Sequence, residues 1–192
     1  MNLPTLKRFT IEEYHRLTEL GFFQEDDRVE LVRGQLIYRA AKGTLHSVCS
    51  TRLNRQLTKL VGDQATLRGQ ELIALPNDGE PEPDFAIVRN HADDYLSGHP
   101  RPEDILLLIE ISDSSLTYDQ ETKLELYAED GIQHYWIFNL IDRVLEMYSE
   151  PYQTSEFGYR VKRIALPNER VKLPCFSELW LDLSIVFPTA TV

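Results

Sequence analysis

The chain has 192 residues, of which 42% are hydrophobic and 27% are charged. These values are typical of a soluble globular protein and exclude a disordered chain, a collagen-like repeat and a coiled-coil rod. The length predicts a single domain over residues 1–192. The longest apolar run, Ile105–Ile109, is far too short to span a membrane, and the N-terminus has no apolar segment of signal-peptide length. We therefore expect a cytoplasmic protein with no membrane partner.

The charge argues against one class of function, and the cysteines exclude another. Lysine and arginine total 20 against 31 acidic residues, a net charge of −11, and such a chain is a poor non-specific binder of polyanions. Cys49 and Cys175 lie far apart with no CxxC spacing. A zinc site built on thiolates is therefore excluded.

The first half of the chain predicts helices around a hairpin. Thr10 and Glu13 have the spacing of a capping box, which predicts that a helix begins at Ile11. An apolar stripe through Cys49, Leu53 and Leu57 predicts a second helix. In chain order the predicted elements are a helix over 11–20, hairpin strands over 28–32 and 35–38, a helix over 46–61, a strand over 66–75 and a strand over 84–88.

The second half predicts more strands around one helix. Residues 105–112 are almost all apolar, which is typical of a strand buried on both faces. The other predicted elements are a helix over 116–129 ended by Gly131, a hairpin over 133–139 and 143–148, edge strands over 160–166 and 170–173, and a terminal helix or strand over 176–187. The sequence thus predicts an α/β or α+β domain with a mixed central sheet.

Three charged residues stand out against this pattern. Asp84 follows a proline at the start of a strand, and Glu110 lies near the end of the most hydrophobic strand. If these strands are antiparallel neighbours, the two carboxylates converge. Lys123 lies on the helical stripe that also contains Leu116 and Tyr127, so it should point towards the sheet.

Two acids and a lysine at one end of a buried sheet suit the metal-dependent hydrolysis of a phosphodiester. Mg²⁺ prefers hard oxygen ligands and binds through one or two carboxylates, water and substrate phosphate, and Mn²⁺ can substitute for it. A lysine can orient the attacking water or stabilise the transition state.

Each residue also has a purely structural interpretation. Asp84 can be a strand-end cap, Glu110 and Lys123 can form a structural ion pair, and Lys123 can extend its amine to solvent. His46, on the apolar face of its helix, is either a core histidine or part of the site. Gln70 and Ser112 are further residues that could line the same pocket.

An ordered set of short motifs runs through the chain. In chain order they are Glu30-Leu-Val-Arg-Gly34, His46, Pro83-Asp84, Leu108-Ile-Glu110-Ile-Ser112, Asp119 with Lys123, Tyr127, and Gly131-Ile-Gln-His-Tyr-Trp136. With this set the chain resembles the Uma-two family, which is classed with restriction endonucleases in the PD-(D/E)-x-K nuclease superfamily. The resemblance covers about residues 10–187.

The resemblance implies a restriction-endonuclease-like core, with a mixed sheet flanked by helices and an added N-terminal helix and hairpin, and DNA cleavage with Mg²⁺. Asp84 and Glu110 match the two metal-binding acids, and the Ile111 carbonyl matches a third metal ligand. The superfamily's lysine normally lies two residues after the second acid, where this chain has Ser112. In this family the lysine is moved to the following helix, which matches Lys123. Glu30 matches an additional acid of the first hairpin.

The net charge is unevenly distributed. Residues 39–70 contain six basic side chains and one acidic side chain, a local charge of +5. Arg52, Arg55 and Lys59 lie on a non-apolar face of the predicted helix, where they could contact DNA phosphates or form an ordinary solvated surface. Any binding to DNA should be weak and salt-sensitive. A homodimer could join two such faces.

Three functions remain open. The first is a metal-dependent deoxyribonuclease that uses Asp84, Glu110, Lys123 and Glu30. The second is a catalytically inactive module of nuclease fold that binds nucleic acid or protein. The third is a hydrolase of small phosphoesters that uses the same acids.

Overall fold

The computed structural model describes residues 5–24, 27–39, 41–77 and 79–189. Its helical elements are α1 (Ile11–Glu19), α2 (Thr44–Val61), α3 (Leu116–Tyr118), a π-helical turn (Asp119–Lys123) and α4 (Leu124–Glu129), with three single 3₁₀ turns at Gly62–Gln64, Pro102–Asp104 and Leu183–Ile185. The strands are β1 (Val29–Val32), β2 (Gln35–Tyr38), β3 (Thr66–Gly69), β4 (Phe85–Val88), β5 (Ile105–Ser112), β6 (His134–Asn139), β7 (Val144–Gln153), β8 (Phe157–Ala165), β9 (Arg170–Lys172) and β10 (Trp180–Asp182).

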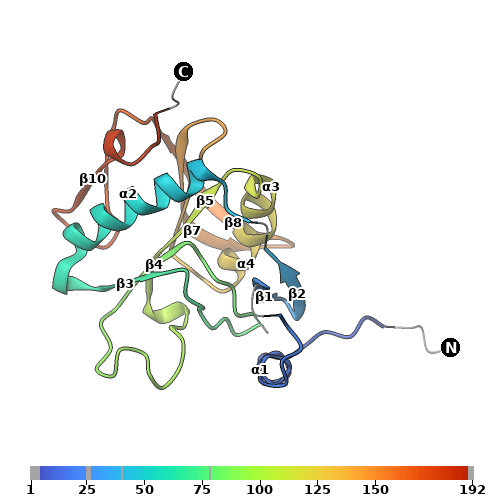
Figure 1. Cartoon of the computed structure of the whole chain (residues 1–192). Helices are drawn as coiled ribbons and strands as arrows, with labels where there is room; N and C mark the ends of the chain where they lie inside the picture. The colour runs from blue at the N-terminus through green and yellow to red at the C-terminus, as the bar shows by residue number, and fades with distance from the viewer. Residues whose placement is uncertain (1–4, 25–26, 40, 78, 190–192) are drawn as a thin grey trace.

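A six-stranded mixed sheet in the order β3-β4-β5-β6-β7-β8 forms the centre of the fold (Figure 1). The β5–β6 pair is parallel and every other neighbouring pair is antiparallel. The β1–β2 hairpin and the β9–β10 pair form two separate small sheets. This architecture confirms the predicted α/β fold with a mixed central sheet.

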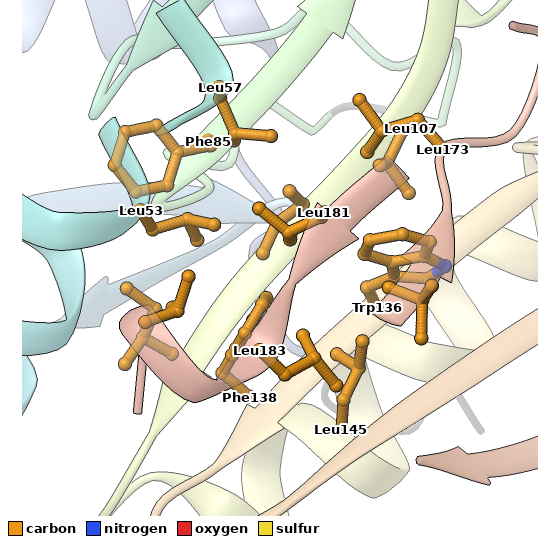
Figure 2. Packing of buried hydrophobic residues seen from close by; sticks show 14 of the residues in the cluster. Leu53, Leu57, Phe85, Leu107, Trp136, Phe138, Leu145, Leu173, Leu181 and Leu183 are labelled. Atoms are coloured by element: carbon orange, nitrogen blue, oxygen red, sulfur yellow. The ribbon is translucent and has the colours of Figure 1, made fainter. Parts of the chain in front are cut away.

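Two apolar layers cover the sheet because successive side chains of a strand point to opposite faces. On one face, Leu53 and Leu57 of α2 pack with Leu107, Trp136 and residues of the C-terminal segment (Figure 2). On the other face, Leu108 of β5 and Ile137 of β6 pack with Leu126, Tyr127 and Tyr135. Glu110 follows Leu108 by two residues, so its carboxylate lies on the second face. The strand 105–112 is thus buried on both sides, as predicted.

The structure confirms several of the predicted elements. The Thr10–Glu13 capping box is present at the start of α1, and the two hairpins pair antiparallel. β4 and β5 are antiparallel neighbours, with Phe85 opposite Ile109.

Other predicted elements need correction. The strand predicted over 66–75 ends at Gly69, because Gln70 has a left-handed backbone with a φ of 55°. The helix predicted over 116–129 is interrupted by the π-helical turn. The strand predicted over 170–173 pairs with β10 and does not join the edge of the main sheet. In the described part of the chain, no helix combines the length and the hydropathy needed to cross a bilayer.

Candidate active site

A cavity of about 260 Å³ opens where β1, β2 and the start of α2 meet the central sheet. Among the residues that line it are Glu30, Lys42, His46, Asp84, Glu110 and Lys123. Glu30, Asp84, Glu110 and Lys123 are each almost completely buried. Charged groups are rarely buried unless they are paired, so their partners determine what this cavity can do.

Asp84 immediately precedes β4 and has three partners. Its Oδ1 atom accepts a hydrogen bond from the Lys42 ammonium at 2.8 Å. Its Oδ2 atom accepts one from the Ile111 backbone N–H at 2.9 Å and lies 3.0 Å from His46 Nε2. Burial alone would raise the pKa of Asp84, but His46 and Lys42 hold it well below its usual range. Asp84 is therefore a carboxylate anion at neutral pH.

Glu110 lies beside Asp84 on the neighbouring strand. Its Oε2 atom accepts a hydrogen bond from the Asp84 backbone N–H at 3.3 Å. Its Oε1 atom accepts hydrogen bonds from the Lys123 ammonium at 2.7 Å and the Tyr127 hydroxyl at 3.0 Å. Burial raises the pKa of Glu110 to about 7, against the opposing attraction of Lys123. Two acids with such different pKa values can perform different functions in one site.

Lys123 reaches the cavity from the π-helical turn. Its ammonium also lies 3.6 Å from Glu30 Oε2. Burial alone would lower the pKa of Lys123, but the negative charges of Glu110, Glu30 and Asp119 raise it well above its usual range. The ammonium therefore stays charged at neutral pH. π-helical turns are rare and often occur at functional sites, because the extra residue changes the direction of the side chains.

Some polar atoms around the cavity have no partner. In the described residues, five buried side-chain nitrogen or oxygen atoms lack a hydrogen bond. Three of these, Glu30 Oε1, His46 Nδ1 and the Tyr118 hydroxyl, belong to residues that line this cavity. Buried polar atoms without partners are uncommon, so their concentration here indicates a place for water or a ligand.

The lining of the cavity does not include Ser112 or Gln70, the two further residues predicted there. Ser112 is buried, and its hydroxyl donates a 2.7 Å hydrogen bond to Asp119 Oδ2 beside the site. Gln70 has an exposed side chain and is not among the residues lining the cavity, so its predicted place in the pocket is wrong. The reason is the left-handed backbone at Gln70, which ends β3 early.

The basic face of α2, formed by Arg52, Arg55 and Lys59, is divided, because these side chains differ in exposure. Arg55 and Lys59 are exposed, as expected for side chains that contact phosphates or solvent. Arg52 is half-buried, and its guanidinium donates a 2.9 Å hydrogen bond to the Phe187 carbonyl. Arg52 therefore helps to hold the C-terminal segment against α2.

Sequence reasoning missed Lys42 and Tyr118. Lys42 lies between β2 and α2, outside any regular element, so no periodic pattern could show which way it points. Tyr118 immediately precedes the π-helical turn, whose geometry shifts the helical register there. The only available signal was their closeness in sequence to His46 and Asp119, two residues of the motif set.

The donor set fits a hard divalent cation. In the described residues, no three His, Cys, Asp or Glu side chains are placed to enclose a metal ion by themselves. Mg²⁺ does not require such an enclosure, because it usually keeps several waters and uses one or two carboxylates. Asp84 and Glu110 each supply a carboxylate in the lining of the cavity, and Glu110 Oε2 accepts a hydrogen bond from the Asp84 backbone N–H. Glu30, whose Oε1 atom has no partner, belongs to the same lining.

This fold, with acids at the adjacent ends of β4 and β5, is of the restriction-endonuclease-like class. The model of the Uma2 family, described as "putative restriction endonuclease", matches residues 11–184, and the chain belongs to this family. Family membership confirms the resemblance seen in the motifs. None of the curated proteins matches the sequence.

Among the solved structures that match the chain are a "putative nuclease" and a restriction endonuclease. One is a "putative nuclease" of the DUF820 family from Anabaena variabilis, with a TM-score of 0.68 and 18% identity over 93% of this chain and 97% of that chain. It has the same fold. The other is the type IIG restriction endonuclease BpuSI, with a TM-score of 0.35 and 14% identity over 58% of this chain and 12% of that chain.

Proposed function

We propose that this protein is a metal-dependent endodeoxyribonuclease that hydrolyses phosphodiester bonds in DNA. The observation that carries the proposal is the hydrogen-bonded cluster of Asp84, Glu110 and Lys123 on the wall of one cavity. The family assignment supports a nuclease. The cluster supports the chemistry, because it combines two oxygen donors with a fixed positive charge.

Asp84 and Glu110, with the Ile111 carbonyl, would hold Mg²⁺, and Mn²⁺ would substitute for it. A bound Mg²⁺ would neutralise charge on the phosphoryl group and lower the pKa of its bound water. The low pKa of Asp84 keeps this carboxylate charged and ready to bind a cation.

Lys123 and Glu30 would act on the reacting groups. The Lys123 ammonium would stabilise the negative charge that develops on the phosphoryl oxygens. The unpaired Glu30 Oε1 would accept the proton of the attacking water. The new bond joins the water oxygen to phosphorus, and the P–O3′ bond breaks to leave a 5′-phosphate and, after protonation, a 3′-hydroxyl.

DNA would bind weakly and in a salt-sensitive manner, because the chain as a whole carries a charge of −11. The exposed Arg55 and Lys59 on α2 would contact phosphates near the site. Cleavage of both strands of a duplex would be served by a homodimer, which presents two sites related by two-fold symmetry.

A second candidate is a nuclease fold that binds nucleic acid or protein without catalysis. The specific observation in its favour is that each acid already forms an ion pair with a lysine, Asp84 with Lys42 and Glu110 with Lys123. Such ion pairs satisfy the buried charges without a metal. Calorimetric titration with Mg²⁺ separates the two functions, because an inactive module has no need to bind the ion.

A plasmid-nicking assay with Mg²⁺ or Mn²⁺ tests the proposal. The wild-type protein should cut supercoiled DNA, and Glu110→Gln and Lys123→Ala should abolish cutting. Lys172→Ala, an exposed lysine on β9, provides a matched control that should cut like the wild type. Circular dichroism checks that each variant is folded. Cleavage that survives both site substitutions would refute the site, and no cleavage by a folded wild type would favour the inactive module.

A further inference from the structure

Lys42 occupies an unusual position on Asp84. It lies in the short segment 41–43 between β2 and α2, outside any helix or strand. Its ammonium lies 2.8 Å from Asp84 Oδ1, and its side chain is 16% exposed. Lys42 therefore reaches the buried carboxylate from the mouth of the cavity.

The two oxygens of Asp84 differ in what they can still accept. A carboxylate oxygen has about two lone-pair sites. Both lone-pair sites of Oδ2 are occupied, because the Ile111 N–H and His46 Nε2 are both within hydrogen-bond distance of this oxygen. A cation that approaches Asp84 is therefore restricted to Oδ1, the oxygen that already accepts a hydrogen bond from the Lys42 ammonium.

We propose that Lys42 is a resident cation that competes with the divalent metal for Asp84, so that metal binding requires its ammonium to leave Oδ1. This inference rests on the proposed metal site of the nuclease. Two cations cannot share one carboxylate oxygen without strong repulsion, because the site is buried and poorly screened by solvent. Each bound metal ion therefore displaces the ammonium.

Lys42 rather than Lys123 is the lysine that can move. Lys123 is fully buried, and its ammonium contacts both Glu110 and Glu30. Lys42 has one carboxylate partner among the described residues and is partly open to solvent. Residues 41–43 belong to no strand, so Lys42 can move without breaking hydrogen bonds between strands. The ammonium can therefore swing towards solvent while the rest of the site stays in place.

The exchange explains how the metal-free protein tolerates a buried aspartate. An unpaired buried carboxylate strongly destabilises a fold. Lys42 supplies a positive charge on Oδ1, in addition to the contacts that His46 and the Ile111 N–H make with Oδ2. When a metal arrives, it takes over the same function. Lys42 thus lowers the apparent affinity for the metal while it stabilises the metal-free state.

Isothermal titration of the metal-free chain with Mg²⁺ and Mn²⁺ tests this exchange. Lys42→Met removes the competing charge and keeps most of the side-chain volume, so we expect it to bind either ion roughly tenfold more tightly than the wild type. Lys172→Met makes the same change on an exposed strand and should bind like the wild type. Lys42→Arg keeps the charge and should bind no more tightly than the wild type.

Thermal melting gives a second measurement that does not depend on cleavage. Metal-free Lys42→Met should melt below the wild type, and added Mn²⁺ should raise its melting temperature by more than that of the wild type. If Lys42→Met does not fold without metal, Lys42→Gln serves instead, because its neutral amide can still donate a hydrogen bond to Asp84.

The outcomes separate this inference from the proposed nuclease. An affinity in Lys42→Met equal to or weaker than that of the wild type would overturn the inference, whether or not the wild type cuts DNA. If Lys42→Met binds metal, but the wild type neither binds metal nor cuts DNA, the inference would be supported and the nuclease proposal overturned. Absence of binding in every variant would overturn both.

Discussion

The Lys123 ammonium and the Glu110 carboxylate form an ion pair of 2.7 Å, and both side chains are completely buried. Glu110 belongs to β5 and Lys123 to the π-helical turn before α4, and the burial of both side chains shields their charges from water. Removing one partner of such a pair leaves an uncompensated charge in the interior. The pair is therefore a sensitive point for stability as well as for the proposed chemistry.

We predict that Lys123→Met lowers the free energy of unfolding by about 3–5 kcal/mol, as is typical when one partner of a buried pair is removed. The double variant Lys123→Met/Glu110→Gln should recover part of this loss, because Glu110 is then neutral and only Glu30 still lacks the ammonium that lies 3.6 Å from its Oε2 atom. Urea denaturation measures both, and neither variant should cut DNA. A double variant as unstable as the single one would show that the loss has another cause.

The hydroxyls of Tyr118 and Tyr127 make a matched pair for a second prediction. The Tyr127 hydroxyl donates to Glu110, whereas the Tyr118 hydroxyl is buried without a partner. Tyr127→Phe should therefore cost about 1.5–3 kcal/mol, the usual value of a hydrogen bond to a charged group. Tyr118→Phe should change the free energy of unfolding by less than about 0.5 kcal/mol.

Urea denaturation of the two tyrosine variants under one set of conditions gives the comparison. Both substitutions remove a single oxygen atom, so differences in volume do not contribute. An equal loss in the two variants would mean that Tyr118 has a partner in the protein. It would then weaken the case that its hydroxyl faces a ligand or a water site.

Much of the site could be predicted from local patterns. Asp84 follows a proline at the start of a strand, and Glu110 lies near the end of the most hydrophobic strand, so the two converge once these strands are antiparallel neighbours. Lys123 is predicted to face the sheet by a helical stripe. The mixed sheet followed from the alternation of apolar segments. In each case the signal is a repeat that a regular element imposes on the sequence.

What could not be predicted depends on irregular backbone. Lys42 lies in a connecting segment, Tyr118 precedes a π-helical turn, and Gln70 has a left-handed conformation. None of these backbones produces a periodic pattern, so the direction of each side chain is fixed only by tertiary packing. Arg52 shares a polar face with Arg55 and Lys59, and only the folded chain shows that it holds the Phe187 carbonyl.

The raised pKa of Glu110 gives a prediction for pH. Burial raises this pKa from its ordinary value of 4.5 to about 7. Between these values the folded protein retains a proton that the unfolded chain has released, so the folded state loses stability as the pH rises from about 4.5 to 7. Glu110→Gln should flatten this part of the stability profile of the metal-free protein.

The same ionisation should act on metal binding in the opposite direction. Because the metal needs the carboxylate form, the affinity for Mg²⁺ and the rate of cleavage should both increase as the pH rises through about 7. Denaturation and calorimetry at half-unit pH steps measure the two effects. A stability slope that is identical in wild type and Glu110→Gln would show that another group titrates in this range.

The divided basic face of α2 predicts two separable effects on DNA. Arg55 and Lys59 are exposed, so Arg55→Ala/Lys59→Ala should weaken binding to a short duplex and reduce its salt dependence by about 0.9 for each lost phosphate contact. Arg52→Ala should instead lower the melting temperature and leave the salt slope unchanged, because this guanidinium holds the Phe187 carbonyl. Fluorescence anisotropy over a salt series, in a Glu110→Gln background that leaves the duplex uncut, measures the slopes. Equal slopes in the double variant and its parent would place the DNA-binding surface elsewhere, and a reduced slope in Arg52→Ala would move Arg52 into that surface.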